Sequence, residues 1–260
     1  MKLLRLFSAI FSLSLRREMA FRANLIFRLL LMVFNIASGF VMLSVVYTHT
    51  QTLDGWNLGE ATVLLGTFQA ISGIFTAFVE PNLRWFAGQI KDGKLDYILV
   101  QPVSSLFLIS LGKCEPLALS QVALGMLLVG LGLHDVGTLP SWWGVLGWLV
   151  LIAVGLTIAW ASRVLIACIC LWVPSIELDV FYSALWQFGR YPVEIYRQPL
   201  RFFLTYVLPF AFLATFPTSA LTGRTSLLLP ILGIAVGCVA VVIVQLVWKV
   251  GLRRYTSATS

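Results

Sequence analysis

Long apolar runs separated by short polar segments dominate the pattern along this chain. A helix that spans a membrane needs about 20 mostly apolar residues. Five runs meet that requirement, at about Leu29–Tyr47, Glu60–Val79, Pro116–Leu133, Trp142–Cys170 and Leu227–Val247. The pattern therefore predicts an all-α integral membrane protein that crosses the bilayer several times.

Residues 1–22 follow a different, amphipathic pattern. Leu4, Phe7, Phe11 and Leu15 fall on one helical face, whereas basic and hydroxyl side chains fall on the other. A charged stretch at 16–18 follows the apolar run, in place of the small-residue cleavage site of a signal peptide. We therefore expect an interfacial helix whose cationic face meets the lipid headgroups.

The region 174–224 leaves two interpretations open. In one, the fifth span is Phe202–Leu221. In the other, a short helix at about Val180–Pro192 is the fifth span, and the chain then re-enters the membrane from outside through Pro199, Pro209 and Pro217 without crossing it. Several prolines within 199–217 disfavour a plain spanning helix, because each removes a backbone donor. Broken backbone is tolerated at membrane depth where protein or water surrounds it.

The basic residues predict the orientation. They cluster before the first span, in the segment 81–105 and after the last span, whereas the loops at 48–59 and 134–141 contain no lysine or arginine. Cytoplasmic loops carry an excess of these residues. We expect the N-terminus, the 81–105 segment and the C-terminus to be cytoplasmic, which requires an even number of spans, and six fits.

Composition supports the membrane class. Apolar residues make up 59% of the 260 residues and charged residues 11%, and the mean hydropathy is +0.93. A soluble domain is about 45–50% apolar and about 25% charged. The net charge of +7 fits the cytoplasmic bias, and no soluble basic module predicts nucleic-acid binding. His49 and His134 lie far apart, and the cysteines form no CxxC pair, so no metal site is predicted.

Amide side chains within the spans are candidates for function, because polar groups are costly in lipid. Asn35, Gln69 and Gln121 are the candidates for a substrate path. The alternative is that they only form hydrogen bonds between helices. No nucleophile–base pair, paired carboxylates or HExxH motif lies in a span, so no catalytic residue is predicted.

The segment 81–105 mixes charged residues with large apolar ones. It is either a plain interfacial loop or a helix that docks a cytoplasmic partner through an apolar ridge. The run from Gly88 to Leu95 nearly matches a phosphate-binding P-loop, but Leu95 stands where that motif needs serine or threonine. No apolar strand precedes it either, so we do not expect ATP to bind here.

Two sequence runs carry a resemblance to a known family. The first, IKDGKLDYILVQPVS, begins at Ile90, and the second, FGRYPVEIYRQP, begins at Phe188 and is followed by Pro209 and the pair Phe216-Pro217. Over essentially its whole length the chain resembles the permease subunits of bacterial ATP-binding-cassette exporters of type 2.

The resemblance implies one permease domain over 1–260 in the bacterial cytoplasmic (inner) membrane, with six spans. It implies an extracellular re-entrant region at 190–222, which favours the second interpretation of span five. The partners it implies are a separate ATPase subunit, which holds ATP and magnesium, and a second copy or a related permease. No cofactor is expected in this chain itself.

The resemblance also assigns the 81–105 segment as the cytoplasmic coupling helix that contacts the ATPase. The expected coupling residues are Leu83, Arg84, Phe86, Lys91, Asp92, Gly93, Lys94, Leu95 and Asp96. The expected cargo is a hydrophobic or cationic small molecule, or a lipid-like compound. The competing functions are a secondary transporter, although no internal repeat of the kind such proteins often show is found, and a membrane scaffold.

Overall fold

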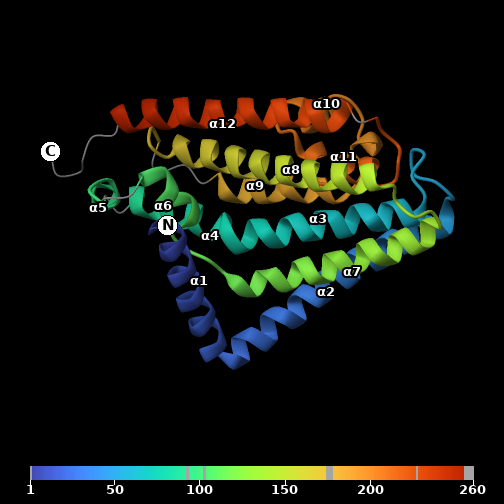
Figure 1. The fold of residues 1–260 in the computed structure, drawn as a ribbon, viewed down its shortest axis with the longest axis horizontal. Coiled ribbons are helices and arrows are strands. Elements are labelled where there is room, and N and C mark those ends of the chain that lie inside the picture. Colours follow the sequence, from blue (N-terminus) through green and yellow to red (C-terminus); the bar gives the residue numbers. More distant parts are fainter. Residues whose placement is uncertain (1, 92–93, 102–103, 174–177, 227, 255–260) are drawn as a thin grey trace.

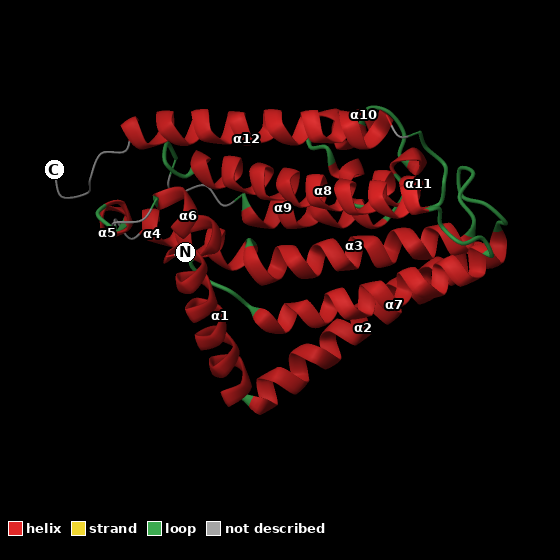
Figure 2. Ribbon diagram, viewed as in Figure 1, coloured by secondary structure: helices red, strands yellow, loops and turns green. Residues whose placement is uncertain are grey.

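The computed structural model describes residues 2–91, 94–101, 104–173, 178–226 and 228–254, and the regular structure of these residues is helical (Figure 2). The long helices lie side by side in one bundle (Figure 1). The α-helices are α1 (Lys2–Ala20), α2 (Arg22–His49), α3 (Leu58–Phe78), α4 (Glu80–Lys91), α5 (Leu95–Leu99), α6 (Ser105–Leu111), α7 (Leu119–Val136), α8 (Trp142–Ile169), α9 (Asp179–Trp186), α10 (Leu200–Phe202), α11 (Thr215–Leu221) and α12 (Leu228–Arg254).

Among the residues that the structure describes, five helices are long and apolar enough to cross a membrane, and they coincide with the five predicted runs. They are α2, α3, α7 with its preceding 3-10 turn (Pro116–Val136), α8 and α12. The multi-pass prediction is confirmed. The first span starts earlier than expected, at Arg22 instead of Leu29. With 28 residues, α2 and α8 are each about 42 Å long, longer than the roughly 30 Å hydrocarbon layer.

The helix α3 lies at the centre of the bundle. In its most apolar stretch 83% of the residues are buried, against 17% in α2 and 22% in α12. The outer helices therefore present apolar side chains on the surface of the chain, and α3 is covered by α7, α8, α2 and the 179–221 region (Figure 1).

Glycines set the close approach of α3 and α7. Gly59, Gly66 and Gly73 are spaced by seven residues along one face of α3. A Cβ atom at Gly66 would lie 2.6 Å from the carbonyl oxygen of Gly125, and one at Gly132 would lie 2.6 Å from that of Gly59. Only glycine fits such backbone contacts, which is the usual role of small residues between membrane helices.

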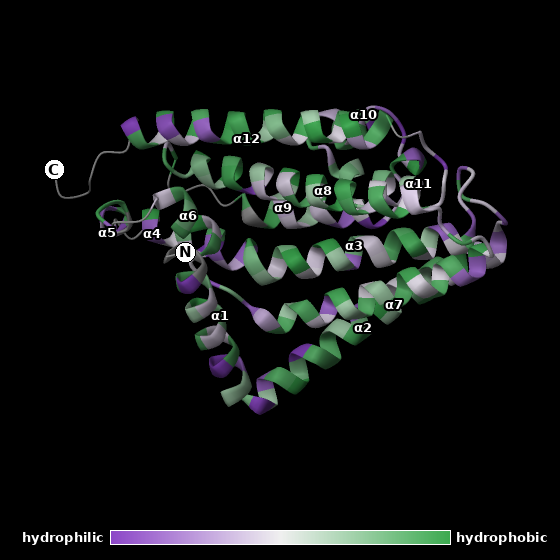
Figure 3. Cartoon of the chain, viewed as in Figure 1, coloured by the Kyte–Doolittle hydropathy of each residue, from purple (hydrophilic) through white to green (hydrophobic). Residues whose placement is uncertain are grey.

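Polar residues gather at the two ends of the bundle (Figure 3). The N-terminus, α4 to α6 and the end of α12 lie at one end, and the connections α2–α3 and α7–α8 lie at the other (Figure 1). At this second end Arg224 binds Glu60 at 2.9 Å and its guanidinium lies 4.5 Å from the centre of the Trp56 ring.

The helix α1 projects at a steep angle from the start of α2 (Figure 1). Its Phe7 and Phe11 rings contact Phe78 at the end of α3, with centroids 5.8 and 6.4 Å away. Near its C-terminus a Glu18 carboxylate oxygen accepts a 2.8 Å hydrogen bond from the Leu117 N–H. Part of the predicted apolar face thus packs on the chain itself. Burial raises the pKa of Glu18 above its ordinary value.

The region after α8 does not form one straight span. The helix α9 and the 3-10 turn Gln187–Arg190 that continues it are too short to cross a membrane. Further on, Leu200–Val207 and Phe210–Leu221 meet at a 71° bend, a geometry that a broken span and a re-entrant loop share.

Candidate functional site

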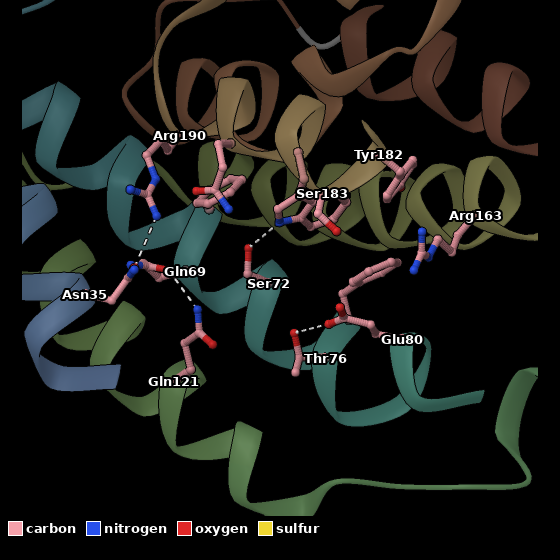
Figure 4. Close-up of a pocket in the computed structure, with 14 residues that line it drawn as sticks. Asn35, Gln69, Ser72, Thr76, Glu80, Gln121, Arg163, Tyr182, Ser183 and Arg190 are labelled. Carbon is pink, nitrogen blue, oxygen red and sulfur yellow. Dashed lines mark hydrogen bonds between the residues drawn. The ribbon is translucent and has the colours of Figure 1, made fainter. Parts of the chain in front are cut away.

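A polar cavity of about 180 Å³ lies beside the middle of α3. Asn35 from α2, Gln69 from α3 and Gln121 from α7 all line it (Figure 4). These are the three amides that the sequence predicted for a substrate path, and the structure brings them together. Gln69 is the twelfth residue of the 21-residue helix α3, so the cavity lies roughly halfway along a span.

The central helix supplies one polar stripe to the cavity. Gln69, Ser72 and Thr76 follow each other at spacings of three and four residues, which places them on one helical face. Ser72 accepts a 3.0 Å hydrogen bond from the indole N–H of Trp186, and Thr76 donates one of 3.1 Å to Glu80 (Figure 4). Hydroxyls at these positions therefore fasten α9 and α4 to α3.

Two further hydrogen bonds join helices across the cavity. The Gln121 amide donates to the Gln69 side-chain oxygen at 2.8 Å, and the Arg190 guanidinium donates to the Asn35 side-chain oxygen at 3.2 Å (Figure 4). The first bond links α7 to α3, and the second links the turn after α9 to α2.

Among the donors that line the cavity, Nε2 of Gln69 and Nε of Arg190 have no hydrogen-bond partner within the described part of the chain. Gln69 is only 1% exposed. A buried donor without an acceptor costs about 1–3 kcal/mol. Such atoms at membrane depth are expected where a ligand or water enters.

Arg163 also lines the cavity, from α8. It is 2% exposed, and its guanidinium lies 4.9 Å from the centre of the Tyr182 ring. Although Arg163 lies late in α8, its side chain turns into the interior, where the face of an aromatic ring partly compensates its charge.

An aromatic wall closes the cavity on the α9 side. The rings of Phe75 and Trp186 stack with centroids 4.5 Å apart, and Tyr182 and Phe210 pack around them. Arg190, Trp186 and the two hydroxyl residues of α3 were not predicted as site residues. Arg190 lies in a sequence run that carried the family resemblance, which was the one signal available.

The predicted coupling residues separate into a buried and an exposed group. Leu83, Phe86 and Leu95 are 2%, 0% and 0% exposed, and the Phe86 ring packs on Trp248 of α12 at 5.5 Å. The apolar ridge of α4 therefore packs against the chain itself. The surface group consists of Arg84 and Lys94, and Asp96 is half-buried. Arg84 forms an ion pair with Glu80.

Apolar surface remains available at the same end of the bundle. Tyr97 and Val100, in and after α5, are 73% and 83% exposed. The Asn82 side chain fixes α4 in place by accepting from the Lys113 N–H at 2.6 Å and donating to the Lys113 carbonyl at 2.7 Å. The Lys91 side chain and residues 92–93, which were also predicted for coupling, lie outside what the structure describes.

Comparison with known proteins gives one match. A family model described as "ABC-2 family transporter protein" matches residues 33–259. Searches of curated proteins and of solved structures found no match. The match includes α3, the cavity and both runs that carried the resemblance, and it confirms the family that the sequence indicated. Four of the five apolar helices, α2, α3, α7 and α8, contribute residues to the polar cavity. The chain belongs to the ABC-2 transporter family, whose members are the membrane subunits of ATP-binding-cassette transporters.

Proposed function

We propose that the chain is the permease subunit of an ATP-driven exporter that moves a hydrophobic small molecule or lipid-like compound out of the cytoplasm. The observation that carries this proposal is the polar cavity halfway along α3, which gathers Asn35, Gln69 and Gln121. Of these amides, Gln69 is buried and has a donor without a partner, whereas Gln121 is half-buried and Asn35 is exposed. A buried polar group at membrane depth is costly, and it is a candidate for a substrate path by default. A cationic cargo, which the sequence also left open, would meet two arginines and one carboxylate among the described residues that line the cavity.

ATP hydrolysis takes place in a separate ATPase subunit in this proposal, and that subunit binds at the end of the bundle formed by α4 to α6. Exposed Tyr97 and Val100, with Arg84, Lys94 and Asp96 around them, form the contact surface. Leu83, Phe86 and Leu95 act from within, because they join that surface to α12 and the bundle core. Movement of the ATPase then reaches α3 through α4, which follows α3 directly.

The proposed orientation places both termini and α4 to α6 in the cytoplasm, in a bacterial inner membrane. The lysines and arginines of α1, α4 and the end of α12 support this, because they lie at one end of the bundle. The α1 helix then lies at the cytoplasmic interface, and the loops at 48–59 and 134–141 are outside.

We further propose that the fifth crossing runs through the α9 helix and its 3-10 turn, which by themselves cover only part of the membrane thickness. In this proposal 190–222 is a re-entrant region on the outer side. A re-entrant loop has a bend such as the 71° bend between Leu200–Val207 and Phe210–Leu221, which a broken span would also have. The support for the re-entrant assignment is therefore the family resemblance. A second permease, identical or related, covers part of the apolar surface of α2 and α12, and lipid covers the rest.

Purification of the tagged chain from native membranes in mild detergent, followed by mass spectrometry, tests the proposal. We expect a nucleotide-binding ATPase in stoichiometric amount, and a related permease if the membrane part is a heterodimer. A chain that comes out alone, folded and able to transport would overturn the proposal and favour a secondary transporter. A scaffold would come out with other proteins but without an ATPase.

A further inference from the structure

The unmatched donors of the cavity point to the chemistry of its occupant. Gln69 Nε2 and Arg190 Nε are both buried without an acceptor in the described residues. We propose, building on the export function above, that the cavity holds the acidic headgroup of an amphipathic molecule: a carboxylate, a sulfate or a phosphate. The occupant supplies the oxygen acceptors that the chain itself leaves out.

The arrangement around Arg190 is suited to an anion. Its Nη2 donates to the Asn35 side-chain oxygen at 3.2 Å, and its Nε has no acceptor in the described residues. Charge-assisted hydrogen bonds from a guanidinium to an oxyanion are about twice as strong as neutral ones. The Gln69 amide adds a neutral donor, and its own oxygen is already engaged by Gln121.

The cavity offers little to a cation. Glu80 is the one carboxylate among the described residues that line it, and this carboxylate is already bound by the Thr76 hydroxyl and the Arg84 guanidinium. The Phe68 ring, which could attract a cation, already has the Arg190 guanidinium 5.9 Å from its centroid. Two arginines, Arg163 and Arg190, also line the cavity, and with the one carboxylate already engaged the charged groups favour an anionic cargo.

The volume fits a headgroup better than a whole amphiphile. The cavity of about 180 Å³ has room for about six water molecules at about 30 Å³ each. A phosphate or sulfate fills such a space, and its apolar tail would extend along the neighbouring Phe75 and Trp186 rings. The tail then lies among apolar side chains, and the charge lies where the donors are.

Two amphiphiles of equal chain length test the inference on the purified full chain, without any ATPase. The probes are dodecyl phosphate and dodecyltrimethylammonium, titrated in a nonionic detergent and followed by native mass spectrometry. We expect the wild-type chain to bind the phosphate at least about tenfold more tightly than the ammonium. Equal binding, or tighter binding of the ammonium, would overturn the inference without any variant being needed.

Variants at one position locate the effect. Arg190→Gln should weaken dodecyl phosphate binding by about tenfold or more, whereas Arg190→Lys, which keeps the charge, should retain most of it. The matched control is Arg197→Gln, because Arg197 lies in the same segment but is exposed and does not line the cavity. A loss with Arg197→Gln equal to that with Arg190→Gln would contradict the assignment to the cavity.

The source of the headgroup and the export function are tested separately. If a membrane lipid is the occupant, phosphatidylglycerol will displace dodecyl phosphate. If the occupant is a transported compound, phosphatidylglycerol will not displace it. The acidic-headgroup assignment stands in both cases. Binding of the anionic probe by a chain that has no ATPase partner would support the inference while the export proposal fails. A working ATP-driven exporter that binds the two probes equally would support the export proposal while the inference about the headgroup fails.

Discussion

Gln121 donates a 2.8 Å hydrogen bond to Gln69, and this bond crosses the interface between α7 and α3 beside one of their close glycine contacts. The contact between the Gly66 and Gly125 backbones lies within about one helical turn of it on each helix. The two amides therefore cannot move apart without disturbing the packing. The pair both holds the bundle together and lines the cavity.

A double-mutant cycle with Gln69→Met, Gln121→Met and the double variant tests this pairing. Hydrogen bonds between membrane helices contribute about 0.6 kcal/mol on average and up to about 1.7 kcal/mol. We expect a coupling energy in that range when the free energy of unfolding is measured in detergent, because each single variant leaves the remaining amide unpaired. Strictly additive single effects would mean that the bond does not form.

The glycine contacts predict a strong position dependence within α7. A Cβ atom at Gly125 would lie 2.7 Å from the Gly66 carbonyl oxygen, whereas one at Gly130 would meet nothing within 4 Å. Gly125→Ala should therefore destabilise the chain by about 1–3 kcal/mol, because the helices must separate. Gly130→Ala, the matched control, should be neutral or slightly stabilising. The melting temperatures of both variants, measured by thermal unfolding, test this prediction. Equal melting temperatures would contradict the close approach of α3 and α7.

The exposed surface of α5 predicts where the ATPase binds. Tyr97 is 73% exposed at that end, and Leu139 is 97% exposed at the opposite end. Tyr97→Glu should reduce the ATPase recovered with the chain by about tenfold, with Leu139→Glu as the control that changes nothing. Asp96→Arg should uncouple hydrolysis from transport. Leu95→Arg is a poor test, because Leu95 is fully buried and its loss would unfold the segment.

Glu18 predicts a pH effect on the attachment of α1. Burial raises its pKa above the ordinary 4.5, so the folded state binds the proton more tightly than the unfolded state does. The stabilisation by this group is complete below pH 4.5 and is lost as pH rises through the raised pKa. The melting temperature of wild type relative to Glu18→Gln should therefore fall from about pH 4 towards neutrality. A constant difference across that range would contradict the assigned burial.

The spans could be predicted because an apolar run of sufficient length has few other uses. The start of α2 at Arg22 could not be predicted, because the apolar run begins only after Arg28. Arg28 lies within the helix and binds Glu115 at 3.1 Å, a contact that the sequence does not show. The three amides were found one by one from their cost in lipid, but their meeting in one cavity depends on helix rotation, which no single run encodes.

The segment 81–105 illustrates a second limit. Amphipathic spacing shows that one face of a helix is covered, but it does not show by what. The ridge containing Leu83 and Phe86 packs against the chain's own core, and the contact of this segment with a partner stays a prediction. Arg190 was not predicted as a site residue, because its position depends on how the proline-rich region folds, and the sequence pattern does not show this.

The measurement that tests the central claim most directly is transport into inverted membrane vesicles, in which the cytoplasmic side faces the medium. The account predicts that a labelled amphiphile accumulates when hydrolysable ATP is added, that a non-hydrolysable analogue does not replace it, and that a proton ionophore has no effect. Accumulation that depends on the chain but follows an ion gradient and needs no ATP would contradict it.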